Sequence, residues 1–163
     1  MPLTRQDSRK ELLALHLPVA ILAIFDGQSP HPSLAYRCRD PHYIFSTPVE
    51  PGGIHITPLW ECGIVVTAYQ HLQPRGRFIT FSLEDSERIT VLGSSFQSVA
   101  AALLIVLWQD EESDEALREI ARLFEFRHFD RLLRECDSRS RSETVADYDA
   151  WHARFLEFCE NAV

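Results

Sequence analysis

"GSSFQSVAAALLIVLWQDEESDEAL", residues 93–117, decides the fold, because the chain changes there from strand-like to helical patterns. Ten consecutive apolar residues, 99–108, lie between a serine-rich start and an acidic end. Ser94 and Gln97 have the spacing of a capping box, which predicts a helix from Ser94 to about Trp108. Ten residues of helix extend only about 15 Å, whereas a membrane span must cross about 30 Å. We therefore predict a buried helix of a folded domain and no membrane insertion.

The start of this stretch also invites comparison with the nucleophile turn of a hydrolase. The motif G-x-S-x-G places a reactive serine on a tight turn between a strand and a helix. Gly93 and Ser95 match its first two fixed positions, but Gln97 stands where the second glycine is needed. We interpret the serine as a helix cap and predict no catalytic residue. A small hydrolase that uses Ser95 or a His/Cys pair is the alternative.

The segments before residue 93 are short, rich in β-branched or alternating apolar residues, and separated by tight turns. They indicate four or five strands, with candidates at residues 43–47, 54–60, 62–69, 77–83 and 87–93. No long helical pattern separates consecutive candidates, which favours an antiparallel meander.

Helical patterns precede and follow these strands. We expect two helices before residue 28. After the apolar helix that begins at Ser94, we expect a helix capped by Ser113 and a short helix near 126–136. A polar linker at 137–143 then leads to an amphipathic helix at 144–162. The predicted fold class is α+β: an antiparallel four- to six-stranded sheet flanked by N- and C-terminal helices. Residues 1–163 are expected to form a single domain.

Composition narrows the function classes. The net charge of −8 argues against a nucleic-acid-binding protein, which usually carries a basic face, although an acidic protein can mimic nucleic acid. The N-terminal residues do not form the apolar core of a signal peptide, so we expect a cytoplasmic protein. The four cysteines form no C-x-x-C pair, and we expect reduced thiols that pack as small apolar residues.

The seven histidines reach neither H-E-x-x-H nor H-x-H spacing. His55 and His71 could meet across neighbouring strands, which leaves a metal pair as one alternative. Surface or half-buried histidines are the preferred interpretation, so the sequence predicts no metal site and no cofactor.

Acidic residues concentrate in one third of the chain. The range from Glu84 to Glu125 contains ten acidic residues and three arginines, which gives it a net charge of −7. One interpretation is a solvated loop and helix start. The other is a contact surface for a basic protein, because complementary charge accelerates encounter.

Three motifs resemble the SUKH superfamily, which includes Smi/Knr-type regulator domains and many bacterial toxin-immunity proteins. They are "PLWECG" at 58–63, "GRFITFSLE" at 76–84 and "LGSSFQSV" at 92–99. The segment "LPVAILAIFDG", 17–27, is similar to the first helix of that group, with Asp26 where asparagine is usual. The resemblance covers about residues 17–135 and leaves the C-terminal helix outside. It implies a non-enzymatic α+β scaffold that binds and neutralises a cognate toxin, such as a nuclease.

These inferences combine into one functional prediction. We expect an immunity protein that binds a toxin with a basic surface and binds neither nucleic acid nor membrane. A general protein-interaction scaffold of the same superfamily is the alternative. The candidate partner-binding residues are Trp60, Glu61, Tyr69, Asp110, Glu111, Glu112 and Asp114. For Trp60, a place in the core is an equally open alternative.

Overall fold

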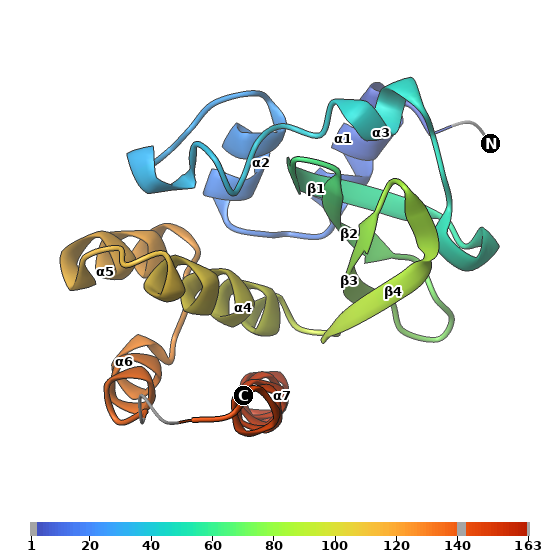
Figure 1. Cartoon of the computed structure of the whole chain (residues 1–163). Coiled ribbons are helices and arrows are strands. Elements are labelled where there is room, and N and C mark those ends of the chain that lie inside the picture. Colours follow the sequence, from blue (N-terminus) through green and yellow to red (C-terminus); the bar gives the residue numbers. More distant parts are fainter. Residues whose placement is uncertain (1–2, 140–142, 163) are drawn as a thin grey trace. The chain divides into compact units, whose positions relative to one another are not determined.

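The computed structural model describes residues 3–139 and 143–162. Contacts along the chain divide it into two compact units, one ending at Ser94 and one starting at Ser95 (Figure 1). The boundary falls inside the stretch that the sequence singles out. This division does not test the prediction of a single domain, which stays a prediction.

The first unit contains the sheet. Its strands are β1 (Ile56–Cys62), β2 (Val65–Gln70), β3 (Arg77–Ser82) and β4 (Asp85–Gly93). They pair in sequence order, each antiparallel to the next, so the predicted meander is confirmed, with four strands. β-Branched residues supply much of the buried face, with Ile56, Val66 and Ile79 fully buried in one cluster.

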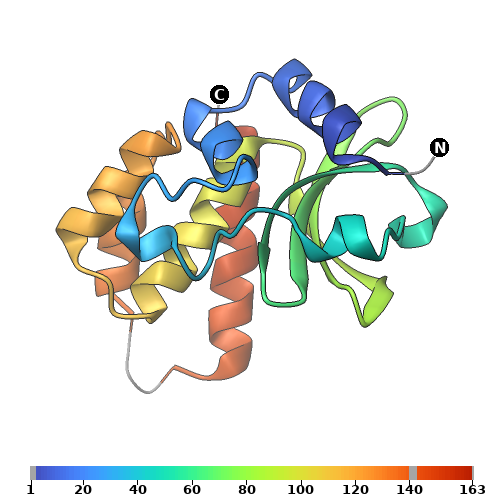
Figure 2. The same cartoon turned by 90° about the horizontal axis from the view of Figure 1, so that it is seen from above.

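Helical segments of the first unit pack on this sheet. They are α1 (Arg5–Ala14), α2 (Val19–Phe25) and α3 (Tyr43–Ser46), with short 3₁₀ turns at Pro32–Leu34 and Pro51–Gly53. Both α1 and α2 contact β1, and Figure 2 shows α1 in dark blue beside the strands. Pro18 is the N-cap of α2, where its missing N–H is not needed.

The second unit is helical. It consists of α4 (Phe96–Gln109), α5 (Asp114–Leu123), α6 (Phe129–Asp137) and α7 (Val145–Asn161). The apolar helix α4 contacts each of the other three and runs alongside α7 in Figure 2. A helix with apolar residues on every side needs such cover, and eight of its residues are buried. The fold class α+β is confirmed, with helices before and after the sheet in the sequence.

Several predicted boundaries need correction. The N-cap of α4 is Ser95, whose Oγ accepts a hydrogen bond from the backbone N–H of Gln97 at 3.2 Å, so a capping box from Ser94 is wrong by one residue. The strand candidate at 43–47 contains the helical turn α3. The amphipathic C-terminal helix is confirmed, and Thr144 caps it. Within the predicted linker, residues 140–142 lie outside the described residues.

The length and polarity of the described helices decide whether one of them can cross a membrane. None of them is both long enough and apolar enough to cross a bilayer, and α4 itself has 14 residues.

Candidate functional site

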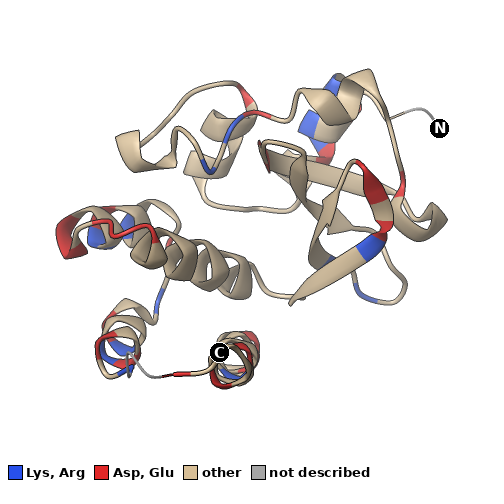
Figure 3. Ribbon diagram, viewed as in Figure 1, with Lys and Arg blue, Asp and Glu red and all other residues tan. Residues whose placement is uncertain are grey.

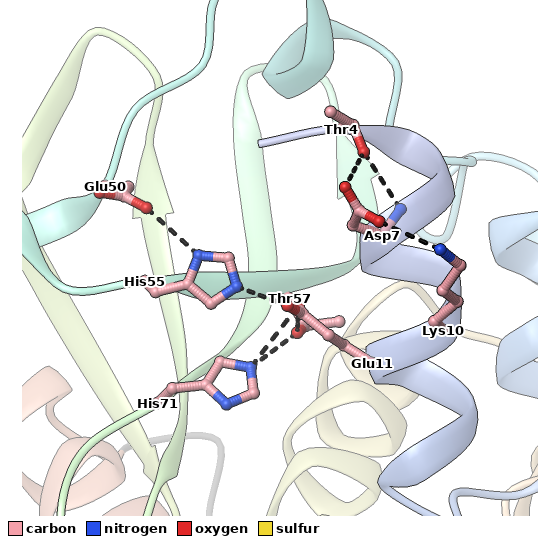
Figure 4. Close-up of polar contacts among 8 residues, drawn as sticks. All are labelled: Thr4, Asp7, Lys10, Glu11, Glu50, His55, Thr57 and His71. Atoms are coloured by element: carbon pink, nitrogen blue, oxygen red, sulfur yellow. Dashed lines mark hydrogen bonds and ion pairs between the residues drawn. The ribbon is translucent and has the colours of Figure 1, made fainter. Parts of the chain in front are cut away.

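Two histidines and a glutamate meet where α1 packs on the edge of the sheet. His55 directly precedes β1 and His71 directly follows β2, and the N–H of His71 donates to the carbonyl of His55 at 2.9 Å. The antiparallel pairing therefore puts the two rings opposite each other, with centroids 5.1 Å apart. Glu11 reaches them from α1 (Figure 4). The sequence allowed the histidine pair as an alternative but gave no signal for Glu11.

A short hydrogen-bond network joins these groups. Oε1 of Glu11 lies 2.8 Å from Nε2 of His55, and Oε2 lies 3.8 Å from Nε2 of His71. The hydroxyl of Thr57, in β1, lies 2.6 Å from Oε2 of Glu11 and 2.7 Å from Nε2 of His71. On its other side, Nδ1 of His55 lies 3.2 Å from Oε1 of Glu50. Each ring is therefore held in a defined orientation.

The surroundings shift the pKa values of His55 and His71 in opposite directions. Burial lowers the pKa of His55, but hydrogen bonds and charge from Glu11 and Glu50 outweigh it and raise the pKa above its ordinary value. Burial also lowers the pKa of His71, and there the charge of Glu11 does not compensate. His71 is therefore the more readily neutral of the two rings at neutral pH, and a neutral imidazole is the form that binds metal ions.

A pocket of about 420 Å³ opens beside this cluster. Its lining includes Glu11, Glu50 and His55, together with Ser8 of α1. Ser8 is only 1 % exposed, and its hydroxyl has no hydrogen-bond partner among the described residues. The pocket thus brings solvent-accessible space and polar groups to one side of the cluster.

A second candidate site lies in the helical unit, where α4 ends. A pocket of about 500 Å³ is lined there by Trp108, Gln109, Glu111, Glu112 and Asp114. Figure 3 shows the acidic ribbon of the α4–α5 connection and the start of α5 in red. The structure thus places three of the predicted acidic residues with Trp108 in the lining of one pocket, whereas Asp110 is exposed beside them as the C-cap of α4.

Local backbone geometry explains this gathering. The N–H of Glu111 donates to the carbonyl of Trp108 at 3.0 Å, and the N–H of Glu112 donates to the carbonyl of Leu107 at 3.1 Å. These are the two hydrogen bonds of a Schellman motif. Glu111 holds φ = 63° at the position that usually carries glycine. Ser113 then caps α5 by accepting from the N–H of Ala116, as predicted. This tight connection places Glu111, Glu112 and Asp114 within a few residues of Trp108, and all four line the same pocket.

The remaining predicted contact residues lie in the sheet and have structural roles. Trp60 is 4 % exposed, so it belongs to the core and offers no exposed anchor. Glu61 is 2 % exposed, and its carboxylate accepts hydrogen bonds from the N–H groups of the α3 N-cap His42 and of Tyr43 and Ile44 at 2.8–3.0 Å. Tyr69 is half-buried and packs edge-on against His71 and Phe78.

The position of Tyr69 also depends on a glycine. A Cβ added at Gly76 would lie 2.3 Å from the Tyr69 ring, so the missing side chain makes room for the aromatic group. Trp60, Glu61 and Tyr69 are therefore not part of the acidic pocket in the helical unit. Partner binding by these three residues stays a prediction.

The other nucleophile candidates have environments that disfavour reaction. All four cysteines are free, and three of them are buried. Burial raises the pKa of Cys136 and of Cys159 to about 12, and raises that of Cys38 further, so these thiols are protonated at neutral pH. The hydroxyl of Ser95 accepts the capping bond from Gln97. The alternative of a Ser95 or cysteine hydrolase therefore gains no support from this geometry.

Comparison of the chain with protein families, with curated proteins and with solved structures finds no match in any of the three.

Proposed function

We propose that the chain is a non-enzymatic immunity protein that binds and neutralises a cognate bacterial toxin through the pocket around Trp108. The observation that carries the proposal is the meeting of Glu111, Glu112 and Asp114 with an indole ring in one pocket of the helical unit. An arginine or lysine of a basic partner is the side chain that such a pocket suits.

The chemistry of recognition follows from these groups. An indole face attracts a cation at about 0.5–2 kcal/mol, more as water is excluded. Carboxylates bind a guanidinium through short, charge-assisted hydrogen bonds. The local excess of negative charge also raises the rate of encounter with a basic protein. Together these features favour a partner whose active-site face is rich in arginine or lysine.

The toxin part of the proposal is supported by the sequence resemblance to the SUKH superfamily. The α+β fold agrees with what that resemblance implies, and nuclease toxins carry the basic surfaces that an acidic pocket would cover. The proposal retains the cytoplasmic location that the sequence suggests. A general interaction scaffold with a different protein partner remains the alternative outcome.

The test is co-expression with the protein encoded by the adjacent gene. We expect the chain to protect cells from that protein and to co-purify with it. The triple variant Glu111→Gln, Glu112→Gln and Asp114→Asn removes three charges at the pocket and should weaken both effects. Three exposed acids of the β3–β4 region offer a control with the same charge change: Glu84→Gln, Asp85→Asn and Glu87→Gln.

A further variant separates folding from binding. Glu111→Gly places glycine at the left-handed position, which should stabilise the end of α4 by about 1 kcal/mol. It also removes one pocket carboxylate. We expect equal or higher stability together with weaker binding, whereas unchanged binding by both pocket variants would exclude this pocket as the contact.

A further inference from the structure

We propose that Glu11, His55 and His71 bind one divalent transition-metal ion, and that zinc is the ion this donor set fits. The inference is independent of the toxin partner, because all three residues belong to the sheet-containing unit. Two imidazoles and one carboxylate are a donor set that zinc uses in proteins, completed by a water molecule.

The positions of the donor atoms already approach those of a metal site. One ligand atom from each of the three residues lies within 4.8 Å of the other two. Around a tetrahedral zinc ion with bonds of about 2.0–2.1 Å, donor atoms are separated by about 3.3 Å. Nε2 of His55 lies 2.8 Å from one carboxylate oxygen of Glu11, Oε1, and Nε2 of His71 lies 3.8 Å from the other, Oε2. An ion between the two imidazole nitrogens would take one carboxylate oxygen of Glu11 as its third protein ligand.

The second ring nitrogen of His55 adds an independent argument. Metal-binding histidines usually donate their other N–H to a carboxylate or carbonyl, which fixes the tautomer and aims the free nitrogen at the ion. Nδ1 of His55 lies 3.2 Å from Glu50, and Nε2 points toward Glu11. Figure 4 shows this order of carboxylate, imidazole and carboxylate across the site.

The exposure of the three side chains and the neighbouring pocket also allow the ion to bind a water molecule as a fourth ligand. The three side chains are each about one-third exposed, so an ion can enter without unfolding the unit. The pocket beside Glu11 and His55 has room for a bound water, and its lining includes Ser8, whose hydroxyl has no hydrogen-bond partner in the described part of the chain. Thr57 lies within hydrogen-bond distance of Glu11 and His71 and can orient either group.

The competing interpretation is a hydrogen-bonded brace between α1 and the sheet with no ion. Titration calorimetry of the full-length, untagged and metal-stripped protein with zinc chloride distinguishes the two. We expect one equivalent to bind with micromolar or tighter affinity. His55→Gln, His71→Gln and Glu11→Gln should each weaken binding by about tenfold or more. His42→Gln, at an exposed histidine of the same unit, should leave the affinity unchanged.

Two measurements keep the result interpretable if a ligand variant is unstable. Glu50→Gln keeps all three ligands and should still weaken zinc binding by about tenfold, because it loses the anionic partner of His55. Cobalt added in place of zinc should give the visible absorption of a tetrahedral site with nitrogen and oxygen donors in the native protein and not in His71→Gln.

Three outcomes would overturn the proposal. The first is the absence of saturable binding to the native protein. The second is binding that persists at full strength in the ligand variants. The third is cobalt absorption with the charge-transfer bands of thiolate ligands, which would place the ion on the cysteines instead.

Discussion

Glu61 is a buried carboxylate whose partners are all backbone groups. It lies on β1, and its two oxygens accept the N–H groups of His42, Tyr43 and Ile44. These donors begin α3, a helix of four residues whose N-cap provides no side-chain acceptor. A strand residue therefore does what an N-cap side chain normally does, with the added favourable effect of negative charge at a helix start.

This role predicts a large effect of Glu61→Ala on stability. The change leaves three N–H groups without their acceptor, and we expect the free energy of unfolding to fall by about 2–4 kcal/mol. Urea denaturation measures it. Glu61→Gln should cost less because it keeps one acceptor oxygen, and Glu84→Gln at an exposed site should cost almost nothing. Equal losses for Glu61→Ala and Glu84→Gln would contradict the capping role.

His55 predicts how stability depends on pH. Its pKa is raised in the folded chain, so its stabilising contribution is complete below the unfolded value of 6.5 and is lost as the pH rises through the folded value. Without metal, native protein should therefore lose stability relative to His55→Gln as the pH increases from 6.5 upward. His71, whose pKa shifts in the opposite direction, is present in both proteins and largely cancels.

Urea titrations at several pH values provide this comparison, and a difference that grows with pH would contradict it. Zinc should reverse the trend. Because metal binding requires deprotonated ligands, the stabilisation by zinc should increase over the same range.

At the scale of elements, Ser95 both caps α4 and connects its start to α7. Its side chain caps the helix, and its N–H donates to Oε2 of Glu160 in α7 at 2.7 Å. Ser98, one turn into α4, donates to the same oxygen at 3.2 Å. The start of α4 is thus held by a carboxylate from the end of α7, and both serines have a structural role there.

We predict that Ser95→Ala lowers the free energy of unfolding by about 0.5–2 kcal/mol, the usual cost of losing an N-cap. Ser113→Ala, the same change at the cap of α5, should cost a similar amount. Thermal and urea unfolding followed by circular dichroism provide the measurement. A hydrolytic activity that disappears in Ser95→Ala while stability is retained would favour the enzyme alternative.

Local patterns in the sequence predicted the elements well and the long-range contacts poorly. Alternation and turn residues placed β1–β4, and the spacing of apolar residues placed α5 and α7, because these signals act within a few neighbours. The sequence predicts a strand at residues 43–47 because this short apolar segment lies between two prolines. Residues 43–47 form a helical turn because Glu61, 14–18 residues later in the chain, supplies the acceptors.

The same distinction holds for the candidate sites. His55 and His71 could be paired by counting along two neighbouring strands, and the acidic run was visible as composition. Glu11 comes from a helix 44 residues before His55, and no periodic signal connects them. Likewise, the shared pocket of Trp108 and the acidic residues follows a turn with left-handed backbone at Glu111, a conformation that favours glycine and is not indicated by a glutamate.

At the scale of the whole molecule, the two proposed sites belong to different units. The metal-binding residues lie in residues 3–94, and the acidic pocket lies in the helices that follow. Each can therefore be altered without touching the residues of the other. Between Asp110 and Glu125 there are seven acidic residues and two arginines, a local net charge of −5, so electrostatic attraction to a basic partner is expected to act mainly through this part of the chain.

The most direct test of the central claim is the affinity of the purified chain for the protein of the adjacent gene, measured at low and at physiological salt. We predict tight binding that weakens with salt. The triple charge-neutral variant of Glu111, Glu112 and Asp114 should lose about tenfold or more, and the matched variant of Glu84, Asp85 and Glu87 should remain close to the native protein. Equal affinity of both variants and the native chain would contradict the account.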